Sequence, residues 1–329
     1  MKSGMAVRRL LWAGGLGCGL VLAGLSLPGA RAASTTGAAV NPDSAFVTFL
    51  VGRGQYQTVS SCNPVVPFPD AKSLSDVKAL FDPKGWIASP NVIENYAAHG
   101  ACASGREEYA NWAQLDNLAQ APDAWQPVSA GVHYLRLADL TASQVQAESC
   151  GALSGLAAQG FTRAWGLFAF AGGQYKYNSG AGPSTGNAMA DIVQHCFAFG
   201  RMYGNGVNTR SGTLAPWLVR TLAPIGGTPD TSGGTYEVPS RVISDIKAGV
   251  RPDRWFVMQF YRFRSGYVAG NHNCLGPETT HFTKYNEEYC WEDFQAVIGA
   301  VPSSAVVVDP ATVACAWGRL PDSGWHPGC

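Results

Sequence analysis

Short apolar runs alternate with longer helical patterns along this chain, and this alternation constrains its fold more than any other feature. The runs are rich in β-branched and aromatic residues, which favours strands. They lie at Ala45–Val51, Gly131–Leu135, Gly166–Phe170, Trp255–Phe263 and Ala305–Val308. Apolar residues three or four apart predict helices at Glu107–Gln120, Ser143–Gln159, Ala188–Phe199 and Ser240–Gly249. The alternation predicts an α/β fold, a parallel sheet or barrel whose ligand site lies at the carboxyl ends of the strands.

The amino-terminal 32 residues have the pattern of a signal peptide, with a basic start, an apolar stretch and a small-residue cleavage site. These features are Lys2, Arg8, Arg9, residues 10–27 and Ala30-Arg31-Ala32. We therefore expect cleavage near Ala32, a secreted protein of the extracellular space or cell envelope, and no membrane span after signal removal. No linker, charge run or repeat interrupts the rest, so we expect a flexible segment at 33–44, one barrel domain at 45–316 and a carboxyl-terminal extension at 317–329.

Charge and cysteine content narrow the class of protein. Lys and Arg number 23, as do Asp and Glu; four of the bases lie in the signal segment, which leaves 19 against 23, a formal −4. A nucleic-acid partner is therefore not expected, because such binders need a basic face. Eight cysteines follow the signal: Cys62, Cys102, Cys150, Cys196, Cys274, Cys290, Cys315 and Cys329. An even count in an exported chain, without C-x-x-C or paired Cys/His spacing, favours disulfides over zinc. We expect sequential neighbours to pair, although the spacing alone leaves other pairings open.

Several segments also follow one another in the order of a known family's motifs. Phe46–Gly52 is similar to a Thr-Phe-Asp-Asp-Gly turn, and Ala130–Thr141 to a segment with His-x-x-x-His and a following Asp-Leu-Thr. Further similar segments are Gln159–Phe161, Phe168–Gly173, Asp191–Arg201 and Arg254–Tyr261. In this order they resemble the secreted polysaccharide deacetylases, the NodB-homology group of carbohydrate esterases. The resemblance implies an irregular (β/α) barrel of the NodB-like type, disulfide-bonded here, and a function connected with polysaccharide.

The resemblance also implies that the family's chemistry has been lost. That family uses an Asp and two His on a divalent metal, a second Asp as base and a late His as acid. At the matching positions stand Leu50 and Val51 for the two Asp, Leu137 for the second His and Tyr261 for the acid, so that His133 alone remains. Catalytic metal sites take about three protein ligands. We therefore expect a degenerate member with no metal and no other cofactor, and we do not expect deacetylation by the family's mechanism.

The favoured hypothesis is a secreted carbohydrate-binding or cell-envelope accessory protein with a polysaccharide or oligosaccharide partner. Aromatic rings stack on sugar faces, while amides and guanidinium groups hydrogen-bond hydroxyls. The expected substrate-binding residues lie near strand ends: Arg53, Tyr56, His133, Tyr134, Tyr175, Gln259 and Tyr261. Candidates for a catalytic role, should activity remain, are His133, Asp139 and Tyr261. A structural histidine is the competing interpretation of His133.

Two alternatives stay open. The first is a metal-independent carbohydrate hydrolase, so the sequence does not decide whether the protein is an enzyme. An esterase could use Gly182–Gly186, which matches G-x-S-x-G, but its polar, glycine-rich surroundings favour a loop. A glycosidase could use Asp139 with a second acid from the later half of the chain, although Asp139 could equally cap a helix. The second alternative is an interaction module, marked by an exposed apolar patch.

Overall fold

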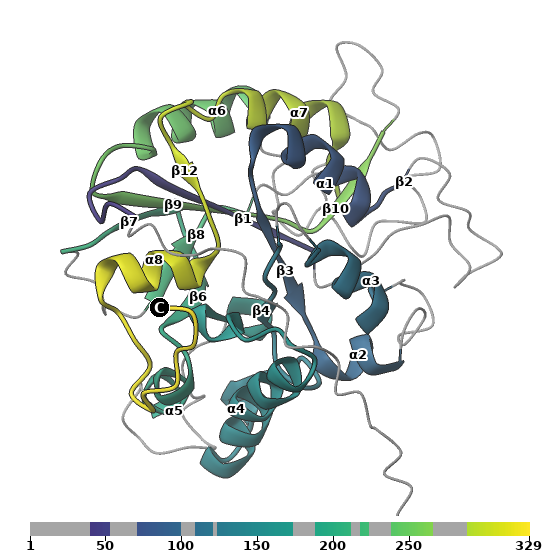
Figure 1. Ribbon diagram of the computed structural model, residues 1–329, viewed down its shortest axis with the longest axis vertical. Coiled ribbons are helices and arrows are strands. Elements are labelled where there is room, and N and C mark those ends of the chain that lie inside the picture. Colours follow the sequence, from purple (N-terminus) through teal and green to yellow (C-terminus); the bar gives the residue numbers. More distant parts are fainter. Residues whose placement is uncertain are drawn as a thin grey trace, which may run out of the picture. The chain divides into compact units, whose positions relative to one another are not determined.

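Parallel strands form the central sheet of this computed structural model (Figure 1). The structure describes residues 40–52, 71–99, 109–120, 124–173, 188–211, 218–223, 238–265 and 288–329. Within them the strands pair in the order β9, β1, β3, β4, β5, β6 and β8. Their bounds are β1 Phe46–Val51, β3 Ala88–Val92, β4 Val128–Ser129, β5 Leu167–Ala169, β6 Phe199–Tyr203, β8 Leu218–Thr221 and β9 Arg254–Phe260.

A short bridge closes this sheet into a barrel. Leu222, directly after β8, forms a parallel bridge with Met258 of β9. Its amide donates to the carbonyl of Val257 at 3.0 Å, and its carbonyl accepts from the amide of Gln259 at 2.8 Å. The barrel is irregular because β12 (Val306–Val307) also pairs with β1, and β7 (Val207–Thr209) runs antiparallel beside β9. A small second sheet contains β2 (Ala71–Lys72), β10 (Arg262–Arg264) and β11 (Glu288–Cys290). The predicted α/β barrel is thereby confirmed.

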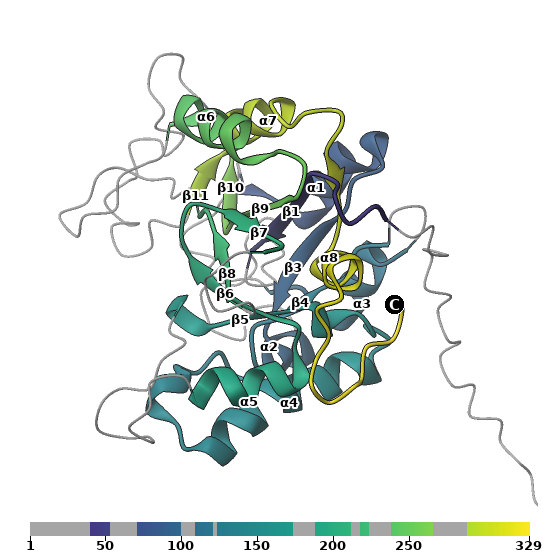
Figure 2. The same ribbon diagram turned by 90° about the vertical axis from the view of Figure 1, so that its left-hand side faces the viewer.

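Helices pack against the outside of the barrel, with α6 and α7 on one side and α4 and α5 on the other (Figures 1 and 2). Their bounds are α1 Leu74–Phe81, α2 Glu94–His99, α3 Trp112–Leu118, α4 Ala142–Ala158, α5 Ala188–Cys196, α6 Pro239–Gly249, α7 Trp291–Gly299 and α8 Pro310–Trp317. Short 3-10 turns lie at Asp82–Lys84, Leu137–Asp139, Ala164–Gly166 and Ala171–Gly173. Capping boxes at Ser73, Asn111 and Thr141 fix where α1, α3 and α4 begin. No described helix has the length and apolar character needed to cross a bilayer.

Strand alternation sorts the core into two layers. Phe49 of β1 points outward, where its ring packs against Phe81 of α1 and Phe294 of α7. Phe46 and Trp255 are paired in register and point inward at the amino ends of their strands. Both rings pack against Trp317 of α8, at centroid distances of 6.3 and 5.9 Å. Large aromatic side chains therefore fill the amino-terminal end of the barrel.

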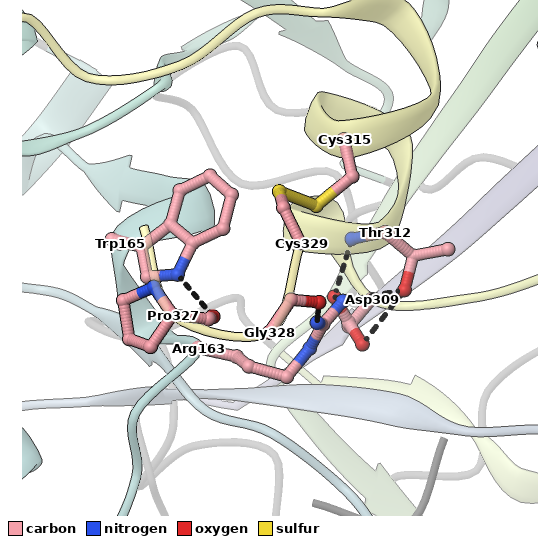
Figure 3. The surroundings of a disulfide bond; sticks show 8 residues. All are labelled: Arg163, Trp165, Asp309, Thr312, Cys315, Pro327, Gly328 and Cys329. Atoms are coloured by element: carbon pink, nitrogen blue, oxygen red, sulfur yellow. Dashed lines mark hydrogen bonds and ion pairs between the residues drawn. A yellow bond between two sulfur atoms is a disulfide. The ribbon is translucent and has the colours of Figure 1, made fainter. Parts of the chain in front are cut away.

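The carboxyl-terminal tail is fastened at this same end (Figure 3). Arg163 donates to Asp309 at 3.2 Å, to Thr312 at 2.8 Å and to the carbonyl of Gly328. Residues 318–329 contain no helix or strand, and Cys315–Cys329 ties them to α8 with a Cα–Cα distance of 5.5 Å. The tail is therefore held by a disulfide and by the hydrogen bond from Arg163 to Gly328.

The disulfides follow the expected pairing where the structure gives both partners. Cys150 of α4 bonds to Cys196 of α5, and Cys315 bonds to Cys329, each to its sequential neighbour. Cys290 is disulfide-bonded too. Cys62, Cys102 and Cys274 lie outside the described residues.

One predicted strand is wrong. Residues 131–135 form a turn, and the strand before them is β4, Val128–Ser129. The apolar residues that suggested a strand belong instead to a bent segment, since Gly131 and Tyr134 have φ angles of 95° and 60°. Such positive values are incompatible with a strand. The other four predicted strands are confirmed, with ends that differ by a few residues and with Trp255–Phe263 divided into β9 and β10.

Candidate functional site at the carboxyl ends of the strands

Polar side chains occupy inward positions near the carboxyl ends of the barrel strands. The pairing register places Gln259 beside Leu50, and Leu50 beside Ser89, so all three face the same side as the inward Trp255. Arg201 lies two residues after Phe199, whose ring packs on that of Trp255, and Thr221 is paired with Tyr203. The inward polar set is Ser89, Asn91, Arg201, Thr221 and Gln259, and none is more than 2% exposed.

Each member of this set has a polar atom without a hydrogen-bond partner in the described part of the chain. These atoms are Ser89 Oγ, Asn91 Oδ1, Arg201 Nε and Nη1, Thr221 Oγ1 and Gln259 Oε1. Buried polar groups are nearly always paired, because an unpaired one loses its hydration without compensation. Five residues on four strands share this property at one end of the barrel. Such a concentration is typical of a site that receives polar groups from a ligand or bound water.

Three tyrosines border the inward polar set. Tyr203 ends β6, Tyr261 directly follows β9, and Tyr134 lies in the turn after β4. The hydroxyls of Tyr203 and Tyr261 hydrogen-bond to each other. Tyr261 is 6% exposed, whereas Tyr203 is 42% exposed, so one ring is buried and the other reaches solvent. Tyr134 packs against a small buried cluster that includes Ala130 and Ala169. Together these residues offer aromatic surface and hydroxyl groups beside the polar set.

Arg201 links the tyrosines to the polar set. Its Nη2 donates to the carbonyl of Phe170 at 2.9 Å, and its Cζ lies 4.6 Å from the ring centroid of Tyr203. Burial lowers the pKa of Arg201, but the phenol groups of Tyr261, Tyr203 and Tyr134 outweigh it and raise that pKa. Burial in turn raises the pKa of the Tyr261 phenol above its usual range. At neutral pH the site therefore holds a guanidinium cation beside the uncharged phenol of Tyr261.

A buried carboxylate fixes the turn that carries Tyr134. Glu148 of α4 is 4% exposed, and its Oε1 accepts the amides of His133 at 2.8 Å and Leu135 at 3.2 Å. Its Oε2 lies 3.3 Å from Nδ1 of His133. Gly131 has no room for a side chain, because a Cβ there would collide with Glu148. Glu148 thus holds the backbone on both sides of Tyr134 and orients the His133 imidazole.

Glu94 is a second carboxylate near this turn. It begins α2, and its amide donates to the carbonyl of Gly131 at 3.1 Å. Burial raises the pKa of Glu94 and the charge of Glu148 adds to this, while His133 opposes it. Its carboxylate lies against Gly155 of α4, where any Cβ would collide with it. His133, Glu94 and Glu148 therefore lie around this turn, on the side that faces the outer helices α2 and α4.

The residues expected from the sequence fall into three groups. Tyr134, Gln259 and Tyr261 come together at the carboxyl ends of the strands, whereas the His133 side chain, which is 55% exposed, contacts Glu148 of α4. Asp139 is elsewhere: its side chain is 53% exposed and pairs with Arg136 at 3.8 Å, and Thr141, not Asp139, caps α4. Arg53, Tyr56 and Tyr175, together with the segment Gly182–Gly186, lie outside the described residues. Leu50, Val51 and Leu137 are buried. No three His, Cys, Asp or Glu side chains of the described residues group as metal ligands.

Sequence reasoning missed Arg201, Asn91 and Thr221 at the polar set, and Glu94 and Glu148 beside the turn. Two of these residues stand out in the sequence pattern once their elements are known. Glu148 lies on the buried stripe of α4 with Val145, Ala152 and Leu156, where an acid is unusual. Arg201 lies at an inward position of a buried strand. A charged residue at an otherwise apolar position indicates either a paired structural group or a binding site.

Comparison with known proteins adds little. The sequence matches no family model and no curated protein. Among solved structures the fold is similar to the crystal structure of a probable polysaccharide deacetylase from Pseudomonas aeruginosa PAO1. The match has 10% identity, covers 85% of this chain and 94% of the other, and has a TM-score of 0.43. At that score and identity the likeness supports no statement about activity, and the barrel is established by its own strand pairing.

Proposed function

We propose that this protein binds carbohydrate at the carboxyl ends of its barrel strands. The observation that carries the proposal is the set of five buried residues whose polar atoms have no partner in the described residues, bordered by three tyrosines. A sugar offers many hydroxyl groups, each both donor and acceptor, and an apolar ring face that packs on aromatic rings. The acceptors Gln259 Oε1 and Asn91 Oδ1 and the Arg201 donors match such a ligand.

The proposed setting is outside the cytoplasm, where the protein would act as a secreted or cell-envelope accessory protein. Disulfides persist in oxidising compartments, and Cys150–Cys196 and Cys315–Cys329 are both formed. The signal-like first 32 residues agree with this location.

Calorimetric titration of the purified protein with a panel of neutral and acidic oligosaccharides tests the proposal. We expect at least one ligand to bind, and Gln259→Leu to weaken it about tenfold, because the amide is replaced by an apolar group of similar volume. Tyr289→Phe is the control, since Tyr289 packs on Phe260 in the outer layer. Failure of every oligosaccharide to bind, or equal weakening by the control, would contradict the proposal.

A metal-independent hydrolase is the second candidate function, and the raised pKa of Glu94 favours it. Burial raises the pKa of Glu94, and a raised pKa is typical of a carboxyl group that acts as a general acid; His133, which Glu148 orients, is the neighbouring imidazole. The assay is acetate release and bond cleavage on acetylated glycans, with added zinc and again with chelator. Turnover that persists in chelator and is lost in Glu94→Gln would support this function. Turnover that requires metal would contradict it.

A further inference from the structure

Arg201 is a buried cation that pairs with no carboxylate of the described residues. It is 1% exposed, and its Nη2 donates to the carbonyl of Phe170. Its Nε and Nη1 have no hydrogen-bond partner in the part of the chain that the structure describes. Removing a guanidinium from water is costly unless an anion or several hydrogen bonds replace the hydration. The buried guanidinium of Arg201 therefore lowers the stability of the folded protein, and it lies at the proposed binding site.

A second buried arginine, Arg163, shows how a structural guanidinium is paired in this protein. Arg163 is 7% exposed and lies 3.2 Å from the carboxylate of Asp309. It also donates to Thr312 and to the carbonyl of Gly328. A structural arginine in this fold thus has an internal counter-ion. Arg201 differs in this respect, because no carboxylate of the described residues pairs with it, which leaves that place for an external anion.

The position of the guanidinium fits such an external anion. Its bond to Phe170 places it just beyond Ala169, the last residue of β5. The ring of Tyr203 covers one face of it and is itself 42% exposed, so the aromatic cover of the guanidinium is in contact with solvent. Burial raises the pKa of the Tyr261 phenol, whose hydroxyl hydrogen-bonds to that of Tyr203, so the Tyr261 phenol does not neutralise the cation.

We propose that the glycan bound at this site is acidic, and that a sugar carboxylate of the uronic-acid type binds to Arg201. This inference rests on the proposed function and adds the class of ligand. The carboxylate oxygens accept from Nε and Nη1 in charge-assisted hydrogen bonds, which are stronger than neutral ones. Sugar hydroxyls donate to the nearby acceptors Gln259 Oε1 and Asn91 Oδ1. The ligand thereby supplies both the charge and the donors that the inward polar set lacks.

The experiment compares matched ligands. Oligomers of galacturonic, glucuronic and mannuronic acid are titrated calorimetrically, each beside its carboxyl-reduced form, in which every carboxylate has become a primary alcohol. We expect at least one acidic oligomer to bind about tenfold to a hundredfold more tightly than its reduced form. Arg201→Met should remove that preference, so that the acidic and the reduced oligomer bind this variant with equal affinity. Arg220→Met is the control, because Arg220 lies on β8 between the inward Val219 and Thr221 and so points outward.

The outcomes separate the inference from the function on which it rests. Equal affinity for acidic and reduced oligomers, or a preference that survives in Arg201→Met, overturns the acidic ligand and leaves carbohydrate binding intact. No binding of any acidic or neutral oligosaccharide overturns the proposed function itself. Exchange of an unpaired buried charge for an apolar side chain is often neutral or stabilising, so we expect Arg201→Met to fold. Arg201→Lys provides a second variant, which should keep a weakened acidic preference because it retains the charge and loses the guanidinium geometry.

Discussion

Tyr134 is held in a backbone conformation that its residue type disfavours, and this makes a sharp prediction about stability. Its φ is 60°, in the left-handed region, which costs a residue with a Cβ about 1–2 kcal/mol relative to glycine. Glycine loses about 0.5–1 kcal/mol more than alanine on ordering. At the midpoints of the two ranges the difference leaves Tyr134→Gly more stable than Tyr134→Ala by about 0.75 kcal/mol, the reverse of the usual order. Both variants lose the same phenol ring, so loss of its packing cancels in the comparison.

The assay is urea unfolding of both variants at equal m-values, with the midpoint as the readout. Leu135 supplies the control pair, since it is the next residue in the same turn, is 44% exposed and does not have a positive φ. There the usual order should hold, with Leu135→Ala more stable than Leu135→Gly. If Tyr134→Ala equals or exceeds Tyr134→Gly in stability, the turn stores no strain and Glu148 has no constrained conformation to maintain. If Tyr134→Gly is the more stable variant, the backbone of Tyr134 is strained in the folded protein. Such strain is typical of functional sites, and here it would accompany the placement of Tyr134 beside Arg201.

Two further predictions concern the surroundings of the site and the tail. The pKa of Glu94 is raised in the folded protein, so this group favours folding when protonated, and its contribution is lost as pH rises through the folded-state pKa. At pH 7 we therefore expect Glu94→Gln to be more stable than the parent protein. Urea unfolding midpoints should show this difference in stability becoming smaller as the pH is lowered. A difference that does not change with pH would contradict the raised pKa of Glu94. Replacing Cys315 and Cys329 together with Ser should lower the free energy of unfolding by about 3 kcal/mol, the value for a loop of this length, and an unchanged thermal midpoint would show that the tail's other contacts suffice.

The strands of the barrel that are apolar can be predicted from the sequence, and those that contain polar residues cannot. β1 and β9 are nearly continuous apolar runs, because both faces of each strand are buried, and this is the usual pattern of a parallel strand. β3 is Ala-Ser-Pro-Asn-Val, and its polar residues and proline resemble a loop. Its inward serine and asparagine belong to the proposed site. The residues that serve the site are therefore the ones that conceal the strand.

The site is predictable only in part for a related reason. Gln259 and Tyr261 lie at the end of a strand that the sequence predicts. Tyr134 follows His133 in the segment Ala130–Thr141, which the family resemblance singled out. Arg201 lies in β6, which begins at the last residue of the predicted helix Ala188–Phe199, so its inward direction could not be deduced. Glu94 and Glu148 lie on helices and reach the turn only through tertiary packing. Alternation within a strand predicts a face, but the contacts between elements need the register that pairing provides.

The two ends of the barrel interior differ in how their buried polar groups are paired. At the amino-terminal end the indole nitrogen of Trp255 donates to Thr48 Oγ1 at 2.9 Å, and that of Trp317 donates to the carbonyl of Pro42 at 3.2 Å. Polar atoms buried among these aromatic rings are thus satisfied, and α8 with the tail is fastened over them. At the carboxyl-terminal end Arg201 and Gln259 keep atoms without a partner in the described residues. A chain under selection for stability alone would exchange such residues for apolar ones, so their concentration at this end is best explained by a bound partner that pairs with them.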